Sequence, residues 1–333
     1  MPARQPAFWS RSGDALPVRL LSPLAALTAT VAAHRLRRPG WQAPVPVICC
    51  GNATTGGSGK TPLALDLGRR LLDRGVAVHF LLRGYGGNAR GIRRATTTDS
   101  PALVGDEALL LAEVAPTWIG ADRAASARAA IAAGAGALVM DDGLQNPGLR
   151  KDLSLLTVDG GFGFGNGRVL PAGPLREPIA AAAARCVAGV LIGEDRAGAA
   201  RMLPPDFPVL RARLEPGPEI AALAGRRVLA FAGIGRPEKF FASLEQAGAV
   251  VGTRVSFPDH HPYADRQLIR LLDRAKRLDA VPVTTAKDAV RIGPRFREQV
   301  LVAHVRLVWV DGGAAIEPLL DGPACRALEV RAL

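Results

Sequence analysis

The sequence predicts an α/β protein with two parts, a larger domain built on a mostly parallel sheet and a second, smaller α/β domain. The chain has 333 residues, which is long enough for two domains with separate cores. Short apolar runs alternate with helical patterns from residue 45 onward, and a second series of such units begins near Arg226. We expect an N-terminal segment 1–40, a larger domain 41–205, a proline-rich linker region 206–225 and the smaller domain 226–333.

The N-terminal segment contains an apolar run of fourteen residues, "LLSPLAALTATVAA" at 20–33. Such a run is too short to span a bilayer. The densest positive charge follows the run, which is not the order of a signal peptide. Two interpretations remain open: a helix packed on the domain, or a helix in a membrane interface with arginines toward the head groups. The second would place four side chains toward lipid: Trp9, Leu20, Leu21 and Leu24.

The larger domain opens with a phosphate-binding loop. The stretch "GNATTGGSGKTP" follows the apolar run 45–50, and Gly59, Lys60 and Thr61 match the second half of the G-x-x-x-x-G-K-[ST] pattern. Thr54 occupies the position of the first glycine. Glycines permit a nest of inward N–H groups, and the following helix points its positive end at the same place, so a P-loop NTPase-like fold is predicted. The expected nucleotide-binding residues are Thr54, Thr55, Gly56, Gly57, Ser58, Gly59, Lys60 and Thr61.

Acidic pairs occur at two later points of this domain. An apolar run ends in Asp141 and Asp142, and a strand-end aspartate beside a phosphate loop is where Mg²⁺ is held together with the Thr61 hydroxyl. Asp106 and Glu107 open a predicted helix. Acids in a first helical turn are common caps, so the residues alone favour a structural role for Asp106.

Two loops of the larger domain carry arginine. "LLRGYGGNARG" presents Arg83 on a glycine-rich turn, and "LPAGPLREP" presents Arg176 and Glu177 on a loop stiffened by proline. Rigid loops of the second kind are often shaped for a ligand, but a simple surface turn is an equally good interpretation.

The smaller domain is notable for Asp259, His260 and His261 in succession. Adjacent histidines can bind metal, but no second Cys/His pair stands nearby in the sequence. A helix cap or a polar cluster facing a cleft is therefore favoured over a metal site.

Composition limits the partners. The formal net charge is +12, and the basic excess is nearly all arginine, which suits a phosphorylated ligand or a lipid surface but can also reflect coding bias. Nucleic acid is not expected as a partner, because aromatic residues are 5% of the chain and no basic stretch is interleaved with them. The four cysteines have neither metal nor disulfide spacing, which indicates a reducing, cytosolic compartment.

Taken together, the motifs resemble those of one family, tetraacyldisaccharide 4'-kinase, the lipid A 4'-kinase of Gram-negative bacteria. The resemblance covers nearly the whole chain and rests on an ordered set: "GNATTGGSGKTP", "RGYGG", "VGDE", "DDGLQ", "LPAGPLREP", "FPDHH" and "TAKDAV". It implies transfer of the γ-phosphoryl group of MgATP to the 4'-hydroxyl of an acylated glucosamine disaccharide 1-phosphate. The same resemblance implies a monomer acting at the cytoplasmic face of the inner membrane.

The resemblance also implies roles for residues. Lys60 and Thr61 would hold phosphates and Mg²⁺, with Asp141 and Asp142 near the metal. Asp106 of "VGDE" would act as the base for the sugar hydroxyl, and His260 of "FPDHH" would orient it. Because these two residues belong to different domains, we expect the site to be complete only on domain closure. The residues expected to bind the substrate are Arg83, Gln145, Arg176 and Glu177.

The chain departs from the family pattern at a few positions. Leu144 and Asn146 stand where the family usually has Phe and His, and Leu82 and Ala286 replace the usual Ser and Glu. Asn146 cannot titrate, so any role of the usual histidine is lost here. The alternative class is an ATP-driven dimeric switch of the partitioning or metallochaperone type, but that class has a lysine where this chain has Thr55. A GTPase is disfavoured because no N-K-x-D motif occurs.

Overall fold

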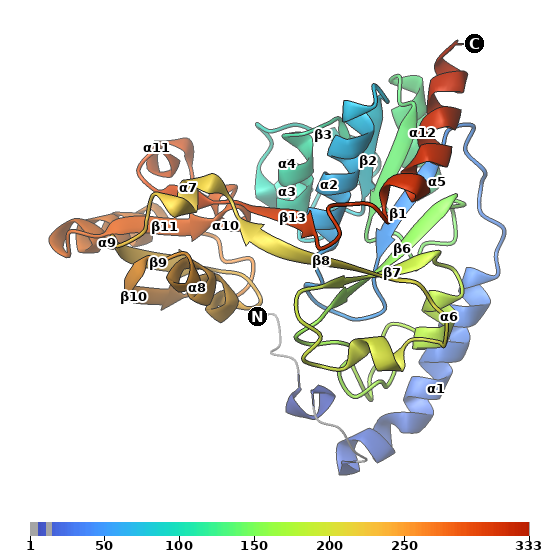
Figure 1. Ribbon diagram of the computed structural model, residues 1–333, viewed down its shortest axis with the longest axis horizontal. Coiled ribbons are helices and arrows are strands. Elements are labelled where there is room, and N and C mark those ends of the chain that lie inside the picture. Colours follow the sequence, from blue (N-terminus) through green and yellow to red (C-terminus); the bar gives the residue numbers. More distant parts are fainter. Residues whose placement is uncertain (1–5, 11–14, 333) are drawn as a thin grey trace.

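The structure, a computed structural model, describes residues 6–10 and 15–332. Figure 1 shows a large sheet with helices on both faces and a smaller α/β unit beside it, joined to the large sheet by the long strands β8 and β13. The α/β class and the mostly parallel sheet predicted from the sequence are confirmed.

The large sheet has nine strands in the order β13-β8-β7-β6-β1-β5-β2-β4-β3. All neighbours pair in parallel except β3 with β4 and β13 with β8, at the two edges. The central strands are short apolar runs buried on both faces, as a parallel sheet covered by helices requires. Their bounds are β1 (Val47–Gly51), β2 (Val78–Leu82), β3 (Arg93–Ala95), β4 (Thr117–Ile119), β5 (Ala137–Asp141), β6 (Leu153–Asp159), β7 (Ala188–Ile192), β8 (Val209–Pro216) and β13 (Val305–Trp309).

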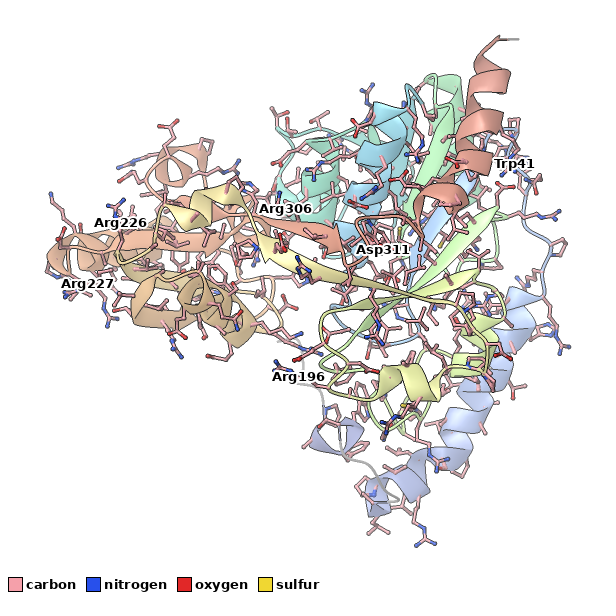
Figure 2. The ribbon with its side chains drawn as sticks, viewed as in Figure 1. Trp41, Arg196, Arg226, Arg227, Arg306 and Asp311 are labelled. Carbon is pink, nitrogen blue, oxygen red and sulfur yellow. The ribbon has the colours of Figure 1, made fainter. Side chains whose placement is uncertain are left out.

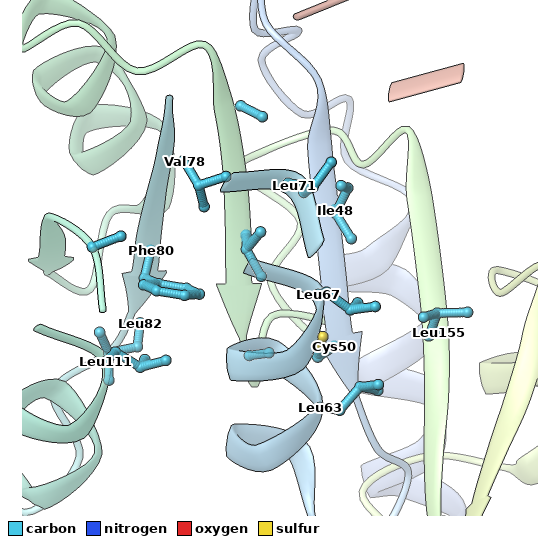
Figure 3. Close-up of a cluster of buried hydrophobic side chains, with 14 of the residues drawn as sticks. Ile48, Cys50, Leu63, Leu67, Leu71, Val78, Phe80, Leu82, Leu111 and Leu155 are labelled. Carbon is cyan, nitrogen blue, oxygen red and sulfur yellow. The ribbon is translucent and has the colours of Figure 1, made fainter. Parts of the chain in front are cut away.

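Two apolar layers cover this sheet, one on each face. Alternate residues of β1 divide between them, because successive side chains of a strand point to opposite faces: Ile48 and Cys50 join one layer, and Val47 and Cys49 the other. Figure 3 shows Leu63, Leu67 and Leu71 of α2 (Lys60–Asp73) in the first layer, together with β-strand side chains. The remaining helices of this domain are α3 (Pro101–Val104), α4 (Asp106–Ala112), α5 (Arg123–Ala132), α6 (Ile179–Ala183), the 3₁₀ turn η2 (Ala199–Met202) and α12 (Glu317–Ala332).

The smaller domain is a four-stranded parallel sheet in the order β10-β9-β11-β12. Its two faces carry separate apolar clusters, centred on Phe241 and Phe231. Its elements are α7 (Pro218–Ala221), β9 (Arg227–Ala232), α8 (Pro237–Gln246), β10 (Val250–Ser256), α9 (Asp265–Arg277), β11 (Val281–Thr285), α10 (Ala286–Ala289), α11 (Pro294–Arg297) and β12 (Leu301–Ala303).

The boundaries differ from those expected. Part of the expected linker is β8, and the chain returns to the large sheet through β13, where Arg306 pairs with Glu215 of β8 at 3.2 Å (Figure 2). Helix α12 then packs in the core of the larger domain, and Trp309 donates a hydrogen bond to Asp66 of α2. The smaller domain is thus an insertion at about 218–304. The sequence did not show this because β8 carries the exposed Arg211 and Arg213 and has no apolar run.

The N-terminal helix corrects two expectations. It runs from Leu16 to Leu36, 21 residues that include an 18-residue window with a mean hydropathy of 1.5, and so has the length and composition of a membrane span, whereas the uninterrupted apolar run alone is too short. Trp9, in the 3₁₀ turn η1 (Ala7–Trp9), donates to the Pro171 carbonyl at 3.2 Å, and Leu21 packs against the domain, so neither faces outward as the interface interpretation required.

The outer face of α1 (Leu16–Leu36) is apolar. Its exposed large hydrophobic residues are spaced by three or four positions and therefore form one stripe. Val18 and Ala25 on the opposite face pack against Ala172 of the larger domain. The stripe consists of Leu16, Leu20, Leu24, Leu27 and Val31.

Candidate active site

The phosphate loop lies between β1 and α2, as predicted. Gly56 and Gly59 have φ of 112° and 84°, which side chains rarely adopt. A Cβ on Gly59 would also lie 2.5 Å from the end of the Ile192 side chain, which would have to move. The Ser58 hydroxyl is buried without a hydrogen-bond partner among the described residues. Loop and helix N-terminus together form the anion site that the sequence indicated.

Thr54 is compatible with this loop for a local reason. It forms an antiparallel bridge with Leu175, and its hydroxyl accepts a hydrogen bond from Asn52 at 3.1 Å. The next residue, Thr55, donates its backbone N–H to the Pro174 carbonyl at 2.8 Å. The extended backbone at position 54 needs no glycine, because the proline-rich loop 170–178 braces it.

The carboxylates at the end of β5 are in different environments. The Thr61 hydroxyl donates to Asp141 Oδ2 at 2.7 Å, while Asp141 Oδ1 is buried without a hydrogen-bond partner in the described part of the chain. Burial raises the pKa of Asp141 to about 6, although Lys60 acts in the opposite direction. Asp142 has Lys60 Nζ at 3.9 Å and receives a hydrogen bond from Arg176 at 2.7 Å. Burial alone would raise the pKa of Asp142, but these two cations hold that pKa below its usual value.

Gln145, Arg176 and Glu177 form one connected group. Gln145 donates to Glu177 and to the Asn52 carbonyl, both at 2.8 Å, and accepts from Arg176 at 3.1 Å. Arg185 donates to both carboxylate oxygens of buried Glu177 at 2.7 Å. Glu177 therefore positions its neighbours. Sequence analysis missed Arg185, which follows α6 with no motif around it.

A second acidic site joins the two domains. Asp106 is 4% exposed at the start of α4, and His260 Nδ1 lies 2.7 Å from its Oδ2. That hydrogen bond raises the pKa of His260, against the effect of burial. His260 has a φ of 58°, which turns the loop after β10 toward the larger domain. The pair expected only on domain closure is thus formed in this structure.

The start of α4 lies near the phosphate loop. Glu107 acts electrostatically on both Lys60 and Asp141, so the two acidic sites share one region. Glu107 also forms an ion pair with Lys287 of α10 at 2.7 Å, a second contact between the domains. A third joins Lys239 of α8 to Asp159 of β6, at 2.7 Å.

Other expected residues lie apart from this centre. Arg83 is exposed and makes no hydrogen bond or ion pair within the described residues, so its role in substrate binding stays a prediction. Asn146 accepts a hydrogen bond from Gly148 in its own turn. His261 stacks on Phe257 with ring centroids 4.6 Å apart. No group of three or more His, Cys, Asp or Glu side chains suited to a metal occurs in the described ranges.

These features define a class. A phosphate loop with two carboxylates beside it, and a buried Asp–His pair across a domain boundary, make a P-loop protein equipped for phosphoryl transfer to an acceptor. The chain belongs to the tetraacyldisaccharide-1-P 4'-kinase family, whose model matches residues 17–322. The resemblance inferred from the ordered motifs is confirmed.

Relatives and a solved structure agree with this assignment. The tetraacyldisaccharide 4'-kinase of Gluconacetobacter diazotrophicus is 56% identical over 95% of this chain and 97% of that protein. The corresponding protein of Gluconobacter oxydans is 53% identical, over 96% and 98%. The crystal structure of LpxK from Aquifex aeolicus in complex with ATP matches with a TM-score of 0.76 and 25% identity, covering 92% of this chain and 99% of that one.

Proposed function

We propose that this chain transfers the γ-phosphoryl group of ATP to the 4'-hydroxyl of a tetraacylated glucosamine disaccharide 1-phosphate. The family and the relatives' names support the reaction. The single observation in the structure that carries it is the Asp106–His260 pair, at 2.7 Å, beside a phosphate loop. A nucleotide switch has no need of a second site of this kind, whereas a kinase must accept a proton from its acceptor.

The nucleotide phosphates are held by the phosphate loop. Backbone N–H groups at 54–61, the N-terminus of α2 and the Lys60 ammonium neutralise their charge. The buried Ser58 hydroxyl, which lacks a partner among the described residues, is available to a phosphate oxygen. Burial lowers the pKa of Lys60, but Asp142 nearby acts against this, and a bound phosphate would do the same.

Mg²⁺ fits beside this loop. Asp141 offers an unpartnered, buried Oδ1 within the described structure, and the Thr61 hydroxyl lies against its other oxygen. Asp142 is already engaged with Lys60 and Arg176, so we assign Asp141 as the closer carboxylate. When bound, Mg²⁺ would supply charge neutralisation for the transferring phosphoryl group. The chain itself orients the hydroxyl and carboxylate that hold it.

Asp106 accepts the proton of the sugar hydroxyl as the new P–O bond forms. An alkyl hydroxyl is a poor nucleophile, so a positioned carboxylate contributes about 10²- to 10⁴-fold. His260 holds the carboxylate in orientation through its Nδ1. Gln145 and Arg176, braced by Glu177, would line the approach of the acceptor, and Arg83 would contact the substrate.

We further propose that the protein works as a monomer at the cytoplasmic face of the inner membrane. The exposed stripe of α1 would enter the acyl layer, and Arg19, Arg35, Arg37 and Arg38 would meet anionic head groups. With α1 in the acyl layer, an acylated acceptor would reach the active site without leaving the membrane.

The deciding experiment is a transfer assay with [γ-³²P]ATP, the disaccharide lipid in detergent micelles and the purified full-length chain. Label should appear in the lipid, and light scattering should report one chain per micelle with and without ATP. ATP hydrolysis that needs no acceptor and is accompanied by dimerisation would contradict the proposal and support the switch class.

A further inference from the structure

A buried arginine contacts the proposed base from the smaller domain. Arg291 follows α10, and its side chain is 5% exposed. Its Nε lies 3.4 Å from Asp106 Oδ2, the same oxygen that faces His260 Nδ1. The side-chain hydrogen bond of the Asp106 carboxylate among the described residues, to His260, falls on Oδ2, and the closest approach of Arg291 is to the same oxygen. Oδ1 is therefore the oxygen left to receive a proton.

The rest of the guanidinium is fixed to the loops that carry His260. One terminal nitrogen donates to the His261 carbonyl and the other to the Gly233 carbonyl, both at 3.0 Å. The second nitrogen also donates to Asp288 at 2.8 Å. A planar fork with fixed donors can meet all these acceptors at once, whereas a lysine ammonium cannot.

Asp288 is itself fully engaged. It is completely buried and accepts hydrogen bonds from Tyr263 at 2.8 Å, Thr285 at 2.6 Å and the Gly233 backbone at 2.8 Å. This ion pair alone would account for a buried arginine within the smaller domain. It does not account for the place of the guanidinium at the domain boundary, where Nε donates to the Lys287 carbonyl at 3.3 Å and also lies 3.4 Å from Asp106 Oδ2 of the larger domain.

We propose that Arg291 is a positioning residue for the transfer reaction: it ties the His260 loop to Asp106, holds Oδ2 of that carboxylate and so directs Oδ1 to the acceptor hydroxyl. The inference rests on the proposed role of Asp106 as base. Arg291 does not touch the substrate, and its effect passes entirely through Asp106.

The test compares Arg291→Gln, Arg291→Lys and the control Arg295→Gln in the full chain, each with and without Asp106→Ala. Arg295 is exposed on α11 and makes no contact with Asp106. In the Asp106-containing chain we expect Arg291→Gln to lower kcat about 10- to 100-fold, below the full contribution of a general base. KM for ATP should stay unchanged, and Arg291→Lys should restore only part of kcat.

In the Asp106→Ala chain, Arg291→Gln should lower kcat by less than about a further twofold, because the carboxylate through which Arg291 acts is absent. Losses that multiply would overturn the inference. If Asp106→Ala itself keeps full turnover, the base assignment fails, and the inference fails with it. Should Arg291→Gln not fold, as circular dichroism would show, Arg291→Lys carries the same comparison.

Discussion

Asp106 and His260 lie 2.7 Å apart although 154 residues separate them along the chain. The first begins a helix of the larger domain, and the second lies in a loop of the inserted domain. The acceptor side of the site therefore exists only when the two domains are in contact.

This pair predicts a specific kinetic pattern. Asp106→Ala should lower kcat about 100-fold or more and leave ATP affinity nearly intact, because the carboxylate accepts the acceptor's proton and does not hold the nucleotide. His260→Ala should also lower kcat. The double variant should lose much less than the product of the single losses, since both residues act on one proton. Fully multiplicative losses would show that they act independently.

Lys60→Ala should abolish transfer. Its ammonium stands at the end of the glycine nest, where the β- and γ-phosphates lie in a P-loop protein. Lys276→Ala, which removes an exposed lysine from α9, is the matched control and should be silent. Turnover like that of the unmodified chain in Lys60→Ala would end the phosphate-loop interpretation.

Asp141→Asn should raise the Mg²⁺ requirement of the reaction and yet stabilise the nucleotide-free protein. The Asp141 carboxyl has a pKa near 3.8 unfolded and about 6 folded, so folding disfavours its ionised form. The folded protein therefore has its full stability below pH 3.8, where this carboxyl is neutral in both the folded and the unfolded state, and loses part of that stability as the pH rises through 6. An asparagine cannot ionise and keeps that stability.

The gain in free energy of unfolding should therefore be near zero at low pH and reach at most about 3 kcal/mol above neutrality. Urea titrations at several pH values, without Mg²⁺ or ATP, measure it. A loss of stability at pH 7.5 would mean that the carboxylate is stabilised by Lys60 and Thr61 more than it is penalised by burial.

Leu20→Ser, Leu24→Ser and Leu27→Ser together should weaken flotation with anionic vesicles and raise the apparent KM for the lipid. They remove about half of the exposed apolar stripe while Val18 and Ala25 still pack inward. Val250→Ser, at an exposed apolar position of the smaller domain, controls for general surface polarity. Removal of residues 1–35 should have the larger effect. Equal flotation of all variants would mean that α1 is only a packed helix.

The sequence alone determined the local parts of this site. A strand, a glycine loop and a helix that follow one another fix the position of Lys60 and Thr61, because their geometry depends on neighbours in the chain. The strand-end Asp141 was found for the same reason, whereas Asp106 was singled out only by the resemblance to the family. The family, too, follows from ordered motifs.

Only the tertiary structure decided how distant segments meet. Arg291 and Arg185 belong to no motif that signals their role, and their partners appear only in the folded structure, where Arg291 lies against Asp106 and Arg185 pairs with the buried Glu177. Likewise β13 and α12 return to the large sheet because Trp309 and Ile316 complete its core, although their sequence continues that of the smaller domain without a break. Hydrophobic burial and charge pairing act through space, so a linear pattern specifies the phosphate loop but not the partners of Asp106.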